Sequence, residues 1–202
     1  EPFIRDDFKE LVEAVVHNRM RFSILSNGTL ITDDMAAFLA STGRCNSIQV
    51  SIDGSVDTTH DAFRGKGNFY RAVSGLKSLM KHNLPATVRV TIHRKNVRDL
   101  EAVSQLLLEE IGLPGFSTNA ASHLGLCRQN AEQVQLTAEE RSLAMDTLLR
   151  LNHKYNGRIS AQAGPLAEAR GWLEMEKARK NGLECLPNRG FLTGCGGFLT
   201  KM

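Results

Sequence analysis

The chain has 202 residues, of which 42% are hydrophobic, 23% are charged and 6% are aromatic, and its net charge is +3. This length suits one domain, or one domain and part of another, and the apolar content is sufficient for a core. The small charge and the sparse aromatic residues do not indicate a nucleic-acid partner, and the lack of any stretch of about 18 apolar residues argues against a membrane span.

Two periods of hydrophobicity predict the elements of the chain. Apolar residues at helical spacing predict a helix over residues 5–19, and alternation of apolar and polar residues predicts a strand from Phe22 to Asn27. The patterns then recur as a helix over 32–43, a strand over 47–53, a helix over 69–82, a strand over 87–93, a helix over 99–111 and a weaker strand over 116–122. This alternation predicts an α/β fold with parallel strands, and the pattern alone leaves a barrel and an open sheet as alternatives.

The pattern changes in the last third of the chain. Residues 123–136 predict a loop, and Thr137 with Glu140 forms a capping-box motif that predicts the start of a helix continuing to Gly157. Beyond Gly164 the pattern loosens into charged helical turns and a glycine-rich tail. We therefore expect a domain boundary near residue 164.

The strand over residues 47–53 is the most informative segment. Its apolar residues occupy every second position, and polar residues that include Ser51 and Asp53 occupy the positions between them. One face of this strand would therefore pack on helices, and the other would line a polar cavity. A polar cavity inside an α/β barrel is a place for a ligand.

Four motifs carry a resemblance to a known family. They are Ser51-Ile52-Asp53-Gly54 followed by His60-Asp61-Ala62-Phe63-Arg64-Gly65, then Glu1-Pro2, Ser26-Asn27-Gly28-Thr29-Leu30, and Gly194-Cys195-Gly196-Gly197. In this order along the chain they resemble radical S-adenosylmethionine (SAM) enzymes, and most closely the branch with a C-terminal SPASM domain. The resemblance implies a partial (β/α)₆ TIM barrel, of which this chain supplies the third to sixth strands.

The resemblance also implies a division of the chain. Residues 1–164 would be the partial barrel without its first strand and its Cys-x-x-x-Cys-x-x-Cys loop, and residues 165–202 a linker helix and the start of the SPASM-type region. Cys45, Cys127, Cys185 and Cys195 do not have the spacing of that loop. The chain therefore resembles a piece of a longer enzyme, and we expect this piece alone to be inactive.

The cofactors that the resemblance implies are SAM, a catalytic [4Fe–4S] cluster with ligands outside this chain, and auxiliary iron–sulfur clusters. Ser51 would bind the ribose of SAM, and Glu1, Asn27 and Asp53 are further candidates for the cofactor site. Asp53 has an alternative role in capping its own turn, and Asn27 has one as a turn residue before glycine. Cys195 is the candidate metal ligand, for an auxiliary cluster and only together with downstream partners.

Candidate substrate ligands lie on the inward faces of the strands. Arg89, His93 and Asn119 are candidates by alternation, with a structural polar network as the alternative reading. Ser26 is a further candidate, because it stands where the family that the chain resembles usually has a threonine and it keeps the hydroxyl group. Arg89 is the best of them, because a fixed cation could hold a carboxylate. Arg64 is expected to be a structural clamp near the barrel mouth.

The function that the resemblance implies is reductive cleavage of SAM and hydrogen abstraction from a peptide or protein, in peptide maturation by cross-link or thioether formation. The expected partners are that substrate and an electron donor such as flavodoxin or ferredoxin, with no nucleic acid and no membrane. Unpaired cysteine spacing favours a reducing, cytoplasmic compartment. The alternatives are a sulfatase or tetrapyrrole maturase of the same superfamily, a phosphate-binding TIM-barrel enzyme, and a barrel that only binds its ligand.

Overall fold

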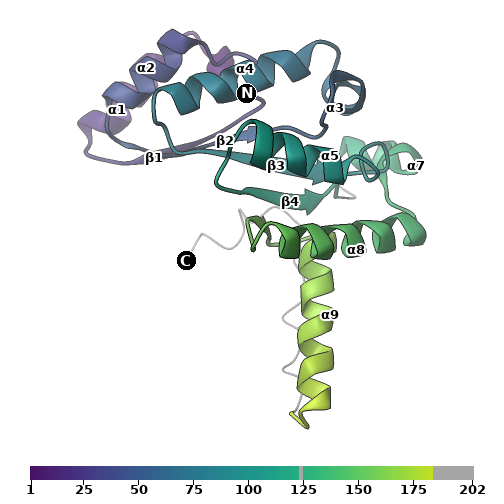
Figure 1. Cartoon of the computed structure of the whole chain (residues 1–202). Helices are drawn as coiled ribbons and strands as arrows, with labels where there is room; N and C mark the ends of the chain where they lie inside the picture. Colours follow the sequence, from purple (N-terminus) through teal and green to yellow (C-terminus); the bar gives the residue numbers. More distant parts are fainter. Residues whose placement is uncertain (123–124, 184–202) are drawn as a thin grey trace.

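The computed structural model describes residues 1–122 and 125–183 (Figure 1). Their strands form one parallel sheet, in the spatial order β1-β2-β3-β4-β5. The strands are β1 (Phe22–Ser26), β2 (Cys45–Ser51), β3 (Ala86–Ile92), β4 (Phe116–Ala120) and β5 (Ile159–Ala161). Parallel neighbours need crossover connections, and helices provide them, as the alternating pattern predicted.

The helices of the described residues are mostly short. They are α1 (Phe8–His17), α2 (Asp33–Ser41), α3 (Asp57–Arg64), α4 (Asn68–Lys81), α5 (Leu100–Gln105), α6 (Leu126–Gln129), α7 (Ala131–Val134), α8 (Ala138–Lys154) and α9 (Pro165–Lys180). A single 3₁₀ turn covers Pro2–Ile4, and a π-helical turn over Leu106–Glu110 continues α5. Among them we find no helix with the length and apolarity that a membrane crossing requires.

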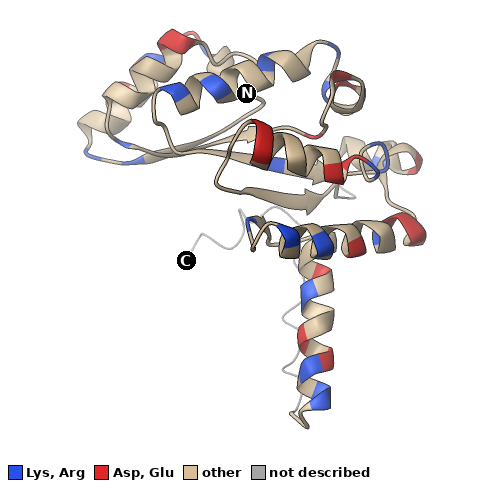
Figure 2. Cartoon of the chain, in the orientation of Figure 1, with Lys and Arg blue, Asp and Glu red and all other residues tan. Residues whose placement is uncertain are grey.

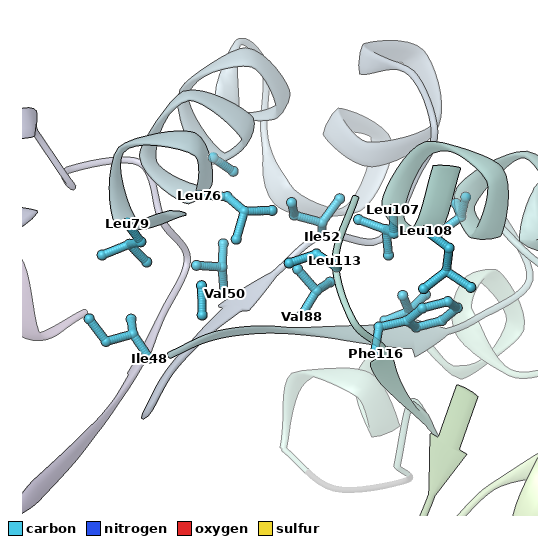
Figure 3. Close-up of a cluster of buried hydrophobic side chains, with 14 of the residues drawn as sticks. Ile48, Val50, Ile52, Leu76, Leu79, Val88, Leu107, Leu108, Leu113 and Phe116 are labelled. Atoms are coloured by element: carbon cyan, nitrogen blue, oxygen red, sulfur yellow. The ribbon is translucent and has the colours of Figure 1, made fainter. Parts of the chain in front are cut away.

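The core lies between one face of the sheet and the helices. Ile48 and Val50 of β2 are fully buried and face Leu79 and Leu76 of α4 (Figure 3). Further along the sheet, Phe116 packs beside the turn at Leu106–Glu110 in the same cluster. Burying each such side chain stabilises the fold by roughly 1.5–3 kcal/mol, so this layer fixes which face of each strand points inward.

The opposite face of the sheet is polar. Its residues lie between the buried ones on each strand, and the register places them side by side: Ser51 beside Arg89, Arg89 beside Ser117, and Thr91 beside Asn119. The side chains on this face are Ser23, Leu25, Ser47, Gln49, Ser51, Thr87, Arg89, Thr91, Ser117, Asn119 and Ser160. We call this surface the open face. Figure 2 shows that the charged residues lie mostly on helices and loops and that the strands are largely uncharged.

A close approach of two glycines fixes the turn after β1. Gly28 has a φ of +79°, which favours glycine, and a Cβ atom there would lie 2.6 Å from Val50 Cγ1. A Cβ atom on Gly75 of α4 would collide with the carbonyl oxygen of Gly28. The two missing side chains let α4 pack directly against the turn.

The predicted capping box at the start of α8 is confirmed. Thr137 Oγ1 accepts from the Glu140 amide at 3.2 Å, and the Glu140 carboxylate accepts from the Thr137 amide at 2.9 Å. Helix α8 packs against α5, α9 and β5. Helix α9 begins at Pro165, buries Leu166 in the core and then extends away from the sheet (Figure 1). The domain division near residue 164 stays a prediction.

The structure corrects three expectations about the elements. The sheet has a fifth strand, β5, where four strands were predicted. The loop predicted over residues 123–136 contains the short helices α6 and α7. The segment before Gly65 is a helix, α3, for which no helix was predicted, because only Ala62 and Phe63 among its eight residues are apolar.

Candidate functional site

The carboxyl ends of β1 and β2 lie at the same edge of the sheet, and polar groups gather there. The Glu1 carboxylate accepts from the Ser26 hydroxyl at 2.8 Å and from the Asn27 amide at 2.7 Å. Ser26 Oγ accepts in turn from the Gly28 amide at 2.8 Å. These bonds place the predicted cofactor residues Glu1 and Asn27 in direct contact, with the predicted substrate residue Ser26 between them.

Asn27 has a structural role within its own turn. Its Oδ1 accepts from both the amide and the hydroxyl of Thr29, at 2.9 and 2.8 Å. This is an Asx-type turn, as expected of asparagine before a glycine with positive φ. The turn also lines a cavity, so a binding role for Asn27 stays a prediction beside this structural one.

A cavity of about 250 Å³ opens next to this edge of the sheet. The turn after β1 forms one wall and helix α3 forms the other, with the first residue of α4 between them. Its lining residues are Asn27, Thr29, His60, Phe63, Arg64 and Asn68. Most of them carry hydrogen-bonding groups, so the cavity fits a small polar ligand or part of a larger one.

Asp53 holds α3 in place over this cavity. Its carboxylate is fully buried and accepts from Arg64 Nε at 2.5 Å and from the Thr91 amide at 2.7 Å. Its backbone carbonyl accepts from Asn96 Nδ2 at 2.8 Å. Both carboxylate oxygens are therefore bonded to groups outside the turn of Asp53 itself. Arg64 forms the clamp that the sequence predicted, and a contact of Asp53 with a cofactor stays a prediction.

His60 lines the cavity as a neutral donor. Its Nδ1 accepts from the Asp53 amide at 3.1 Å, so the proton of the neutral ring is on Nε2. Burial lowers the pKa of His60, and the nearby Asp53 carboxylate opposes that effect. The imidazole is thus held in one tautomer by the same residue that holds Arg64.

His93 lies at the end of β3 and is completely buried. Its ring stacks on Phe63 of α3 with centroids 4.2 Å apart, and Nδ1 accepts from the Lys95 amide at 3.2 Å. Nε2 then carries the proton, and no described residue accepts from it. Burial lowers the pKa of His93 to about 4. Its predicted contact with substrate stays a prediction, and the ring itself supports α3.

Ser51, Arg89 and Asn119 lie on the open face in neighbouring strands. No hydrogen bond joins the Ser51 hydroxyl to another residue in the described part of the chain. Arg89 donates from Nε to Ser117 Oγ at 3.2 Å, and Asn119 Oδ1 is buried without a donor among the described residues. The open face therefore has unused hydrogen-bonding capacity, which a bound ligand could satisfy.

The described residues do not fit an iron–sulfur cluster. Within residues 1–122 and 125–183, no group of three His, Cys, Asp or Glu side chains could hold a metal ion. Cys45 is buried and Cys127 is half-buried, and both are free. Burial raises the pKa of the Cys45 thiol, which disfavours the thiolate that iron requires. Cys195, the candidate ligand of an auxiliary cluster, lies outside the described residues.

Sequence reasoning missed part of the cavity wall. The lining residues that were not candidates are Thr29, His60, Phe63 and Asn68, although the first three belong to motifs that carry the resemblance. The contacts of His60 and Phe63 with residues after β2 and β3 give them their place. These contacts depend on the tertiary fold, and the sequence of α3 alone does not predict them.

The comparisons with known proteins agree with this geometry. Residues 1–107 match the model of the radical SAM superfamily, which is more than half of the chain. The chain therefore belongs to the radical SAM superfamily. Its sheet, with polar groups at the carboxyl ends of parallel strands, is the partial TIM barrel that was predicted.

Three relatives illustrate the similarity. Fe-coproporphyrin III synthase of Methanosarcina barkeri is 36% identical over 157 residues, which cover 76% of this chain and 38% of that protein. Mycofactocin maturase MftC of Mycolicibacterium smegmatis is 36% identical over 107 residues, which cover 52% of this chain and 27% of that protein. SuiB of Streptococcus suis, solved with bound S-adenosylmethionine, has a TM-score of 0.61 at 12% identity and shares the fold, over 81% of this chain and 35% of that one. The chain thus spans less than two fifths of the length of these relatives.

Proposed function

We propose that this chain is the SAM-binding part of a radical SAM enzyme that matures a peptide or protein substrate. The observation that carries the proposal is the group of polar residues at the carboxyl ends of β1 and β2, beside a cavity of about 250 Å³. Membership of the superfamily and the similarity to a peptide maturase support it.

The residues of the chain would bind and orient SAM in this region. The Ser51 hydroxyl, which is half-buried and has no described partner, would bind the ribose. Glu1 and Asn27 would form the neighbouring part of the site, and Ser26 holds the Glu1 carboxylate in place. Asp53 would act mainly through Arg64 and His60, which line the cavity.

When bound, SAM would supply radical chemistry for the removal of a hydrogen atom from the substrate, with an iron–sulfur cluster as its source of electrons. The described residues provide no ligand set for that cluster. We propose that its ligands come from elsewhere in the enzyme, that electrons come from a flavodoxin or ferredoxin in the cytoplasm, and that Cys195 contributes to an auxiliary cluster with further cysteines.

A tetrapyrrole is the second candidate substrate. The similarity to Fe-coproporphyrin III synthase extends over 157 residues, against 107 for the mycofactocin maturase. The polar open face is compatible with either substrate. Sulfatase maturation, and a barrel that binds its ligand without catalysis, remain further alternatives.

The test is SAM binding by the chain, measured by equilibrium dialysis with radiolabelled SAM. Loss of one hydrogen bond corresponds to about 1 kcal/mol, so Ser51→Ala should weaken binding about fivefold. The matched control is Ser160→Ala, which removes a hydroxyl from the same face on β5, away from the carboxyl ends of β1 and β2. Absence of SAM binding by the unmodified chain, or equal binding by both variants, contradicts the proposal.

A further inference from the structure

The open face has one charged side chain among the strands that the structure describes. Arg89 lies on β3, the middle strand of the sheet, and is half-buried between Ser51 on β2 and Ser117 on β4. No carboxylate lies on this face to pair with it, and no ion pair of Arg89 occurs among the described residues. Partial burial of a cation without a partner of opposite charge is unfavourable, and a negatively charged ligand would supply that partner.

The guanidinium of Arg89 is fixed but mostly unsatisfied. Its Nε donates to Ser117 Oγ at 3.2 Å, and Ser117 Oγ lies 3.4 Å from the Val88 carbonyl oxygen. A guanidinium has five N–H donors, so four remain without an acceptor in the described part of the chain. These four groups form the planar fork that matches the two oxygens of a carboxylate.

Asn119 supplies a second unsatisfied group on the same face. It is the next open-face residue after Ser117 on β4, and its buried Oδ1 has no donor among the described residues. A buried acceptor without a donor costs roughly 1–3 kcal/mol, which a suitable ligand would recover. The ligand would therefore present a hydrogen-bond donor close to its negative group.

We propose that Arg89 binds a carboxylate of the substrate, which presents an N–H or O–H group to Asn119 at the same time. This inference deepens the proposed function and rests on it. The carboxylate could belong to a peptide or to a propionate of a tetrapyrrole, and the chemistry that Arg89 recognises is the same. Arg89 would then select substrates by charge, and Ser51 on the neighbouring strand would serve SAM.

The experiment measures preference for an acid over its neutral derivative. The first pair of probes is acetyl-trialanine as the free acid and as the amide, and calorimetry measures their binding. The second pair is coproporphyrin III and its tetramethyl ester, and fluorescence measures their binding. The unmodified chain should bind the acid about 10- to 100-fold more tightly in one pair, which identifies the source of the carboxylate. Arg89→Gln should abolish this preference, and Arg89→Lys should keep part of it because it retains the charge.

The matched control is Arg150→Gln, which removes a cation from the exposed pair with Glu101 on the helical side and should leave the preference unchanged. Equal binding of acid and neutral probe by the unmodified chain overturns the inference, and so does a preference that survives in Arg89→Gln. If Arg89→Gln lowers the affinity for SAM as much as it lowers the affinity for the acid probe, Arg89 belongs to the cofactor site. That result would also overturn the inference. If the acid preference is present but SAM does not bind, the proposed function fails and the carboxylate site stands.

Discussion

Acid should destabilise this protein through His93, a buried imidazole at the end of β3. The ring is fully buried, stacks on Phe63 and has no acceptor for its Nε2 proton among the described residues. A second proton would place a charge where burial excludes water, and the Asp53 carboxylate offsets only part of that cost. For that reason the pKa of His93 is lowered to about 4 from the usual 6.5.

The sign and size of the effect follow from linkage. The unfolded chain binds the proton at higher pH than the folded protein does, so protons favour unfolding. The stability that depends on neutral His93 is fully present above about pH 6.5 and is lost as the pH falls toward about 4. Between about pH 7 and pH 4.5 the loss amounts to about 2.5 kcal/mol, a large part of the 5–15 kcal/mol typical of a domain.

The assay is urea unfolding, followed by circular dichroism, at several values between these limits. His93→Gln removes the titrating group, so its free energy of unfolding should fall about 2.5 kcal/mol less than that of the unmodified protein over the same interval. His153→Gln, which removes an exposed imidazole near the end of α8, is the control and should keep the full acid sensitivity. Parallel curves for the unmodified protein and His93→Gln would refute the reasoning.

Two further predictions concern the support of the cavity. Asp53→Asn should lower the free energy of unfolding by about 3 kcal/mol, because Arg64 and the Thr91 amide lose a buried charged acceptor, and urea unfolding measures it. An effect as small as that of Asp57→Asn, which removes a half-buried carboxylate at the start of α3, would count against the clamp. Gly75→Ala should lower the stability of the fold by about 1–3 kcal/mol, measured in a thermal melt, because the added Cβ would collide with the Gly28 carbonyl oxygen. The control Ser74→Ala, on the exposed side of α4, should not lower it. Equal melting temperatures of the two variants would contradict the contact between Gly75 and Gly28.

The main strands could be predicted from the sequence, because burial on one face imposes a period of two. Residues such as Ile48 and Val50 show that period clearly, and the structure places them against α4. The three residues of β5 are too few to show a period, so that strand could not be predicted. The helices α6 and α7 have only four residues each, which is too few to show a helical period, so they could not be predicted either.

The candidate site was predictable only in part. Alternation placed Ser51, Arg89 and Asn119 on one face, and the register of β2, β3 and β4 brings them together. The bonds of Asp53 could not be anticipated, because its partners Thr91 and Asn96 follow about 40 residues later. The same holds for the stacking of His93 on Phe63, which joins two segments that no local pattern connects.

The division of the sheet into a packed face and an open face has a consequence for evolution. Substitutions among the open-face residues remove few buried contacts, so they would lower the stability of the fold only slightly. Substitutions at the fully buried Ile48 or Val88 would lower it more, and selection would remove them. The residues of the open face can therefore change in the course of evolution while the packed face and the fold stay the same. On our proposal that Arg89 binds a substrate carboxylate, a single exchange at Arg89 would change the preference from an acidic to a neutral substrate without a new fold.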